Sequence, residues 1–302
     1  MTHHEDIWGW MLAVDFFLAG MGAAVLAIAA IVDLASAGTI PLPVRLAAPA
    51  LIAMGAGLLV LELGKPFEGW RVFMNPKSIL TLGAANMTLA ILFGTAKACM
   101  YLPAVAEHME IASNLRMQAA LSVVLLVLGT VVASYPGVLL GRHVARPFWT
   151  GPGISVLFTL SSFLTAAALI ELTNEFFPSQ QSFHVNRLLL ALVALQTILW
   201  PTYLYIKRTG TTKREAEGAR KWICGSMAPA FWIGVFGCGS LFPFITLLVA
   251  PKLAILSAVL VLIGGAGMRY MVVLSGKERT WITGEQFYYS RLPRGDEPFL
   301  RS

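Results

Sequence analysis

Charged residues are scarce in this sequence. Asp, Glu, Lys and Arg together make up 13% of the 302 residues, whereas hydrophobic residues make up 57%. Soluble domains carry about 25% charged residues, so this protein has too few to cover a soluble surface of its length. The scarcity leaves little material for a separate soluble domain and favours a protein that lies in a lipid bilayer.

Histidine and cysteine are scarce too, which limits the cofactors that the protein can hold. No two of the five His share an apolar stretch, so we expect no haem held by paired histidines within the bundle. The three Cys form no C-x-x-C motif, so we expect no iron–sulfur cluster, no bound metal and no disulfide framework in this protein. A P-loop, an H-E-x-x-H motif and a nucleotide fingerprint are also absent. Electron chemistry would therefore need a mobile cofactor or a partner's cofactor.

Long apolar stretches are what the sequence has in abundance. Each is about 20 residues long, the length that a helix needs to cross a bilayer. The first is too long for a signal peptide and has no Lys or Arg before it, so we expect it to be a retained span. The sequence predicts an all-α integral membrane protein with eight transmembrane helices, at residues 10–32, 43–63, 79–101, 115–136, 152–171, 186–206, 226–250 and 253–274.

The sequence shows no linker or soluble insertion, so we expect a single membrane domain over residues 1–302. We expect two four-helix bundles, a first half at residues 1–136 and a second at 152–274, with a surface tail at 275–302. The seventh span is rich in helix-disturbing residues, which predict a bend or break: Pro229, Gly234, Gly237, Gly239 and Pro243.

Basic residues are unevenly distributed between the two sides of the expected bundle. When the loops are assigned alternately to two sides, both termini share a side with most of the 22 Lys and Arg. The positive-inside rule then predicts cytoplasmic termini. Topology and anionic membrane lipids explain this basic side, and docking of a partner subunit is the alternative, so we expect no nucleic acid. The basic residues on the other side are Arg45, Lys97, Arg116, Arg187 and Lys252.

Four polar residues at membrane depth are the candidate functional residues. Asp15 lies in the first span, Glu62 and Tyr135 at the ends of the second and fourth, and Arg269 near the end of the eighth. Ionisable groups in a membrane are costly, so each is a functional candidate. The alternation of the spans puts all four near the membrane face that holds the termini. The simpler alternative is a structural salt bridge from Arg269 to Asp15 or Glu62, with Tyr135 at the membrane interface.

This set of side groups suits quinone chemistry. A quinone needs hydrogen-bond partners for its ring oxygens and a group that exchanges protons with them. A carboxylate exchanges protons, a tyrosine both donates and accepts hydrogen bonds, and a nearby guanidinium stabilises an ionised carboxylate. The same set would also fit a proton-coupled secondary transporter, although such proteins bind their substrates nearer the midplane.

Several short motifs follow one another along the sequence, and together they resemble a known family. They are DFFLAG at 15–20, LELGKP at 61–66, WRVFMNP at 70–76, YPGVLL at 135–140, PFW at 147–149 and GGAGMRY at 264–270. In this order they resemble the membrane subunits of the polysulfide reductase type, also called NrfD-like. The likeness covers nearly the whole sequence.

The resemblance implies a haem-free membrane subunit of a multi-subunit respiratory oxidoreductase, as in anaerobic respiration. Such a subunit exchanges electrons between menaquinone or ubiquinone and a four-cluster iron–sulfur subunit. That partner serves a molybdopterin or multihaem catalytic subunit, so the terminal substrate chemistry lies on another polypeptide. The family's site residues carry over to Asp15, Glu62 and Tyr135 as catalytic and quinone-binding residues, and to Arg269 as a quinone-binding residue. The resemblance also implies the cytoplasmic (inner) membrane of a bacterium or archaeon.

Two further interpretations stay open on the sequence alone. In the first the protein is a proton-coupled secondary transporter, and in the second it is a passive anchor that holds a catalytic complex on the membrane. The side of the membrane is open as well, because family members often carry their partners on the outer side, close to the quinone site. Here the motif-bearing side is the basic one, so either the complex faces the cytoplasm, which we favour, or the basic residues serve docking.

Overall fold

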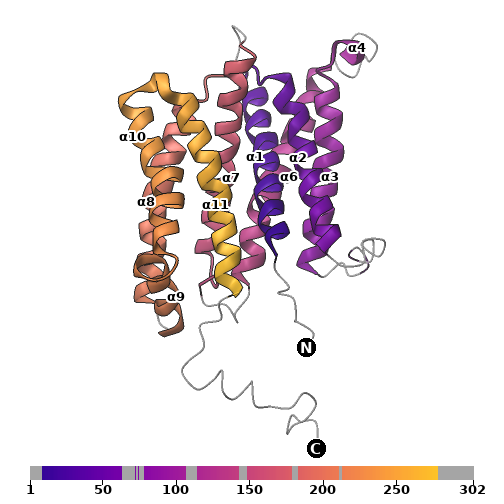
Figure 1. Cartoon of the computed structure of the whole chain (residues 1–302). Helices are drawn as coiled ribbons and strands as arrows, with labels where there is room; N and C mark the ends of the chain where they lie inside the picture. The colour runs from indigo at the N-terminus through magenta and orange to yellow at the C-terminus, as the bar shows by residue number, and fades with distance from the viewer. Residues whose placement is uncertain are drawn as a thin grey trace, which may run out of the picture.

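The computed structural model describes residues 9–62, 72, 74, 78–106, 114–142, 148–178, 183–210 and 213–277. Within these residues eight helices are long and apolar enough to cross a membrane, which confirms the predicted all-α fold (Figure 1). Seven are α-helices, namely α1 (Trp10–Ala35), α2 (Leu42–Glu62), α3 (Ile79–Cys99), α6 (Leu115–Gly141), α7 (Gly153–Phe176), α8 (Asn186–Thr209) and α11 (Ala254–Lys277).

The remaining span combines two helical forms. The π-helix η2 (Ala230–Leu241) continues directly into α10 (Phe242–Val249). Pro243, which has no backbone N–H to donate, stands at the start of α10, where the helical form changes. The irregularity expected in the seventh span is therefore a change from π- to α-helix. Three short helices complete the described residues: α4 (Pro103–Ala106), α9 (Lys213–Cys224) and the 3-10 turn η3 (Pro251–Leu253).

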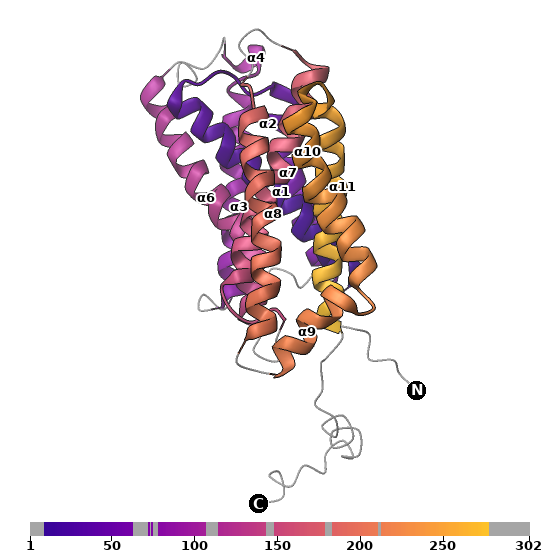
Figure 2. The ribbon, with the colours of Figure 1, turned by 90° about the vertical axis from the view of Figure 1, so that its left-hand side faces the viewer.

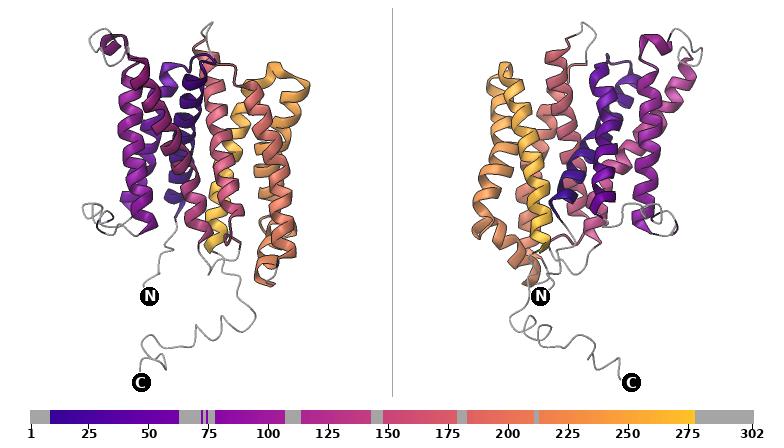
Figure 3. Two further views of the ribbon diagram at one scale, coloured as in Figure 1. Left: turned by 180° about the vertical axis from the view of Figure 1, so that it is seen from behind. Right: turned by 45° about the vertical axis from the view of Figure 1, so that its right-hand side comes forward.

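Helix α1 lies in the interior of the bundle. It packs against α2, α6, α7 and α11, while α3 lies to one side of it and α8 and α10 to the other (Figure 3). Residues Ala19 to Ala24, which are small except for Met21, are all buried. Small residues allow helix backbones to approach closely in lipid, where no hydrophobic effect drives helices together. The central position of α1 therefore follows from its small side groups.

The two ends of the bundle differ. We call the end where α1 begins, α11 ends and α9 lies the α9 end, and the other, which carries α4, the α4 end (Figure 1). Large aromatic residues fill the core towards the α9 end, among them Phe16, Trp149, Phe158, Trp200 and Trp222. The division into two four-helix halves stays a prediction. The predicted tail at 275–302 lies outside the described residues from residue 278 onward.

Candidate functional site

The carboxyl group of Asp15 is buried in the bundle. The residue is 1% exposed, and its Oδ1 atom has no hydrogen-bond partner among the described residues. It fits there because α2 carries Gly55 opposite: a Cβ atom at Gly55 would lie 2.7 Å from Asp15 Oδ1. Leaving a buried oxygen without a partner is costly. Asp15 Oδ1 can therefore accept a hydrogen bond, and no described residue donates one to it.

Glu62 and Tyr135 lie close to Asp15. Glu62, the last residue of α2, accepts a hydrogen bond from the backbone N–H of Gly9 at 2.8 Å, just before α1 begins. Its carboxylate is near enough to Asp15 for the two charges to interact. The charge of Asp15 likewise acts on the phenol of Tyr135, on α6. The structure thus places Glu62 and Tyr135 within electrostatic reach of Asp15.

The ring of Tyr135 rests on a glycine of α3. A Cβ atom at Gly83 would overlap the ring and lie 2.8 Å from the phenol oxygen. Among the described residues, none forms a hydrogen bond with the hydroxyl group of Tyr135. Helices α1, α2, α3 and α6 therefore each contribute to one polar site, in which the phenol is still able to bond a ligand.

Arg269 lies beside this site, fully buried, and bonds to neutral groups. Its Nε donates to the backbone carbonyl of Phe16 at 2.9 Å, directly after Asp15. Nη1 and Nη2 donate to Ser161 Oγ and Ser162 Oγ, each at 2.9 Å, and Nη1 also donates to the carbonyl of Gly265. Within the described residues it forms no ion pair with Asp15 or Glu62. These hydrogen bonds tie α11 and α7 to the backbone of α1, so they fix the position of Asp15.

The motif residues near the α9 end serve to anchor the helices. The indole Nε1 of Trp149 donates to the carbonyl of Val272 at 2.9 Å, and the ring of Phe148 stacks on Trp222 with centroids 4.7 Å apart. These contacts connect the segment before α7 to α11 and to α9. Most residues of the motifs at 61–66 and 70–76, and Pro147 of the motif at 147–149, lie outside the described residues.

A second buried polar cluster, which the sequence did not predict, lies towards the α4 end. Arg45 donates from Nη1 and Nη2 to both carboxylate oxygens of Asp33, at 3.0 and 2.5 Å. Lys97 Nζ lies 3.6 Å from the same carboxylate, and the hydroxyl of Tyr101 donates to it at 2.9 Å. Burial raises the pKa of Tyr101 to about 12, so this phenol keeps the proton that it donates.

One signal in the sequence could have revealed this cluster. Asp33 ends the first span and Arg45 begins the second, and consecutive spans joined by a short loop place such residues at the same membrane face. Opposite charges in that arrangement pair, because an isolated charge at membrane depth is costly. Both carboxylate oxygens of Asp33 accept hydrogen bonds within this cluster. Oδ1 of Asp15, by contrast, has no partner among the described residues.

Comparison with known proteins gives the family. The sequence matches the family described as "Polysulphide reductase, NrfD" over residues 2–279. The protein belongs to this family. The C chain of polysulfide reductase from Wolinella succinogenes is 27% identical over 305 residues, covering 91% of this sequence and 96% of that protein. Protein NrfD of Escherichia coli is 22% identical over 313 residues, with the same coverage of both proteins.

The match confirms the resemblance found in the sequence motifs. The matched residues include all eight spans and therefore the positions of Asp15, Glu62, Tyr135 and Arg269. This NrfD-family member is therefore a multi-pass membrane protein. Among the described residues, no group of three or more His, Cys, Asp or Glu is placed to hold a metal ion.

Proposed function

We propose that this NrfD-family protein is the quinone-reactive membrane subunit of a multi-subunit respiratory oxidoreductase. It exchanges electrons between menaquinone or ubiquinone and a partner iron–sulfur subunit, which serves a molybdopterin or multihaem catalytic subunit. The Wolinella relative is by its name one of several polypeptides of its enzyme, which supports an assembly of this kind. The observation that carries the proposal is the buried Asp15 carboxyl oxygen without a partner among the described residues, next to Glu62 and Tyr135.

The residues of the site have separate tasks in this proposal. Oxidation of a quinol releases two electrons and two protons. The electrons leave to the iron–sulfur partner. The carboxylate of Asp15 accepts the two protons of the quinol hydroxyl groups one after the other, and it gives up the first before it takes the second. Tyr135 forms a hydrogen bond with a ring oxygen, and Glu62, at the end of α2, passes protons on to the solvent. Reduction of a quinone uses the same groups in reverse.

Arg269 is a positioning residue in this scheme. Its guanidinium is 0% exposed and bonds to the carbonyl of Phe16 and to the hydroxyl groups of Ser161 and Ser162. It holds the backbone next to Asp15 in place.

The test is quinol-dependent reduction of the iron–sulfur clusters in the purified complex. Asp15→Asn is expected to lower turnover roughly 100- to 10,000-fold, the range for loss of a general base. Tyr135→Phe removes one hydrogen bond and is expected to raise the KM for quinol roughly 3- to 10-fold. Glu62→Gln is expected to slow turnover by slowing proton release.

Matched controls separate the site from general damage. Tyr205→Phe, on the exposed face of α8, and Glu175→Gln, exposed on α7, remove the same groups elsewhere and are expected to leave both constants unchanged. Assembly with the partner subunits is checked by co-purification. An unchanged KM in Tyr135→Phe together with unchanged turnover in Glu62→Gln would show that the proposed site is wrong, and would favour a passive anchor.

A further inference from the structure

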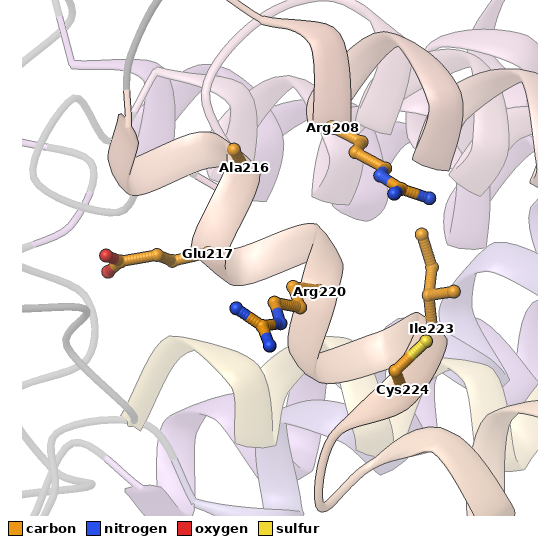
Figure 4. A pocket seen from close by; sticks show the side chains of 6 residues that line it. All are labelled: Arg208, Ala216, Glu217, Arg220, Ile223 and Cys224. Atoms are coloured by element: carbon orange, nitrogen blue, oxygen red, sulfur yellow. The ribbon is translucent and has the colours of Figure 1, made fainter.

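Two cavities between the helices differ in what they offer a ligand. One is a cleft of about 530 Å³ between α8 and α9, where α9 crosses below α8 (Figure 2). Arg208 and Arg220 line it, but their guanidinium groups point in different directions and so form no joint site (Figure 4). The other, which we call the Ser122 cavity, lies between α1, α2, α3 and α6 and has a mostly buried lining. It is lined by Asp33, Arg45, Lys97 and Ser122 and by small or aliphatic residues of these helices.

The hydroxyl group of Ser122 is buried and has no partner. The residue is 1% exposed, and its Oγ forms no hydrogen bond with any described residue. Hydroxyl groups within helices often donate to the carbonyl four residues earlier, as Thr130 on the same helix does to Leu126 at 2.8 Å. For Ser122 that carbonyl belongs to Gln118, and Nζ of Lys97 already donates to it at 3.1 Å. Lys97 thus occupies the acceptor that the hydroxyl would otherwise use.

Lys97 brings a charged group to the same cavity, and this group has a donor to spare. The residue is 4% exposed. Besides its bond to Gln118, Nζ lies 3.6 Å from Oδ2 of Asp33 and 5.6 Å from the centroid of the Tyr101 ring. An ammonium group has three N–H donors, and an aromatic ring is a weak acceptor. The oxygens of Gln118 and Asp33 therefore leave one N–H of Lys97 in need of an acceptor.

Ser122 and Lys97 lie side by side. In an α-helix the carbonyl of Gln118 accepts the backbone N–H of Ser122, and the same carbonyl accepts Nζ of Lys97. Both residues line the cavity, which leaves about 20 Å³ for the centre of a water-sized molecule. About 10–15 Å³ by this measure holds one water molecule. The cavity thus has room for one small polar molecule beside two groups that need a partner.

We propose that the Ser122 cavity binds one ordered water molecule. The water accepts a hydrogen bond from Nζ of Lys97 and forms another with Oγ of Ser122, so it links α6 to the charged cluster around Asp33 by a second contact. Buried water molecules bridge polar groups that the protein leaves unsatisfied. A small anion is the alternative, because two cations line the cavity. The carboxylate of Asp33 in the same lining repels an anion, whereas a water molecule can donate to it.

An experimental structure of the purified full-length protein, at a resolution that shows buried water, gives the direct test. A density peak is expected about 2.5–3.2 Å from both Lys97 Nζ and Ser122 Oγ. Thermal unfolding in detergent gives a second test. Ser122→Ala takes one partner from the bound water, so the unfolding temperature is expected to fall by about 2–4 °C. In a cavity without water the same change removes a buried hydroxyl that had no partner, and the unfolding temperature would rise.

The controls separate water from an anion. Ser134→Ala, on the same helix but outside the cavity, removes a hydroxyl that donates to the carbonyl of Val131, and it is expected to leave the unfolding temperature unchanged. The wild-type protein is expected to unfold at the same temperature in chloride and in gluconate of equal ionic strength. A higher unfolding temperature in chloride assigns the cavity to an anion and overturns the proposal. The proposal is also wrong if a map that shows water elsewhere in the bundle has no peak here, or if Ser122→Ala does not lower the unfolding temperature.

Discussion

At the scale of single residues, the contrast between Asp15 and Asp33 separates function from structure. Both are on α1 and both are largely buried. Asp33 binds Arg45 and Tyr101, so its charge is compensated by the fold. Asp15 has a carboxyl oxygen without a partner among the described residues. A buried group that the protein leaves unsatisfied is available to a ligand, which is why the proposed chemistry centres on Asp15.

A glycine substitution next to Asp15 tests this assignment without removing a functional group. In Gly55→Ala the new Cβ would meet Asp15 Oδ1 at 2.7 Å, so the carboxyl group must move. Quinol oxidation by the complex is expected to fall roughly 10- to 100-fold, because misplaced catalytic groups lose much of their effect. Gly57→Ala, on the same helix, meets open space and is expected to change nothing. Equal activity of the two variants would contradict the placement of Asp15.

At the scale of helices, close contacts between small residues decide which spans are neighbours. Gly239 of η2 and Gly264 of α11 bring the two backbones into direct contact. The same principle places α1 at the centre, where Gly22 faces the backbone of α2 at Ala48. Such contacts replace the hydrophobic driving force, which is weak between helices in lipid.

The contact between η2 and α11 can be tested in the same way. A Cβ atom at Gly264 would overlap the backbone of Gly239, whereas one at Gly267, on the same helix, would meet nothing within 4 Å. Gly264→Ala is expected to destabilise the protein by about 1–3 kcal/mol through overpacking. Thermal unfolding in detergent measures this, with Gly267→Ala as the control. If both variants unfold at the wild-type temperature, the helices do not approach as described.

At the scale of the whole molecule, the polar groups divide between the two ends of the bundle. The proposed quinone site and helix α9 lie towards one end, and the compensated Asp33–Arg45 cluster lies towards the other (Figure 1). We therefore expect the proposed chemistry to take place near one side of the membrane. The distribution of basic residues predicts that this side is cytoplasmic.

Labelling of Cys224 tests the predicted orientation. In a Cys99→Ala/Cys238→Ala background, a membrane-impermeant maleimide is expected to modify Cys224 in inside-out membrane vesicles and not in intact spheroplasts. A cysteine introduced at Asn114, at the start of α6 and so at the α4 end, serves as the control and is expected to show the reverse pattern. Modification of Cys224 in spheroplasts would show that the basic residues serve docking and override the charge rule.

Much of the fold could be predicted because membrane spans are local features. Length and hydropathy alone located all eight spans, and residues such as Pro229 and Pro243 indicated the irregular seventh one. The sequence motifs indicated the family that the comparison confirmed. Because the spans alternate in direction, the sequence predicted which polar residues lie at a similar depth, and it gave four. It did not predict in which direction each of these side chains points.

What the sequence by itself determined is the number of spans, the family and the depth of the polar residues. Only the tertiary structure decided which of them meet. Glu62 and Tyr135 lie within electrostatic reach of Asp15, while Arg269 bonds to Phe16, Ser161 and Ser162. The physical reason is that hydrophobic length belongs to one continuous segment, whereas a contact between helices depends on how each helix is rotated about its axis. That rotation is set by packing between residues far apart in the sequence, such as Gly55 against Asp15.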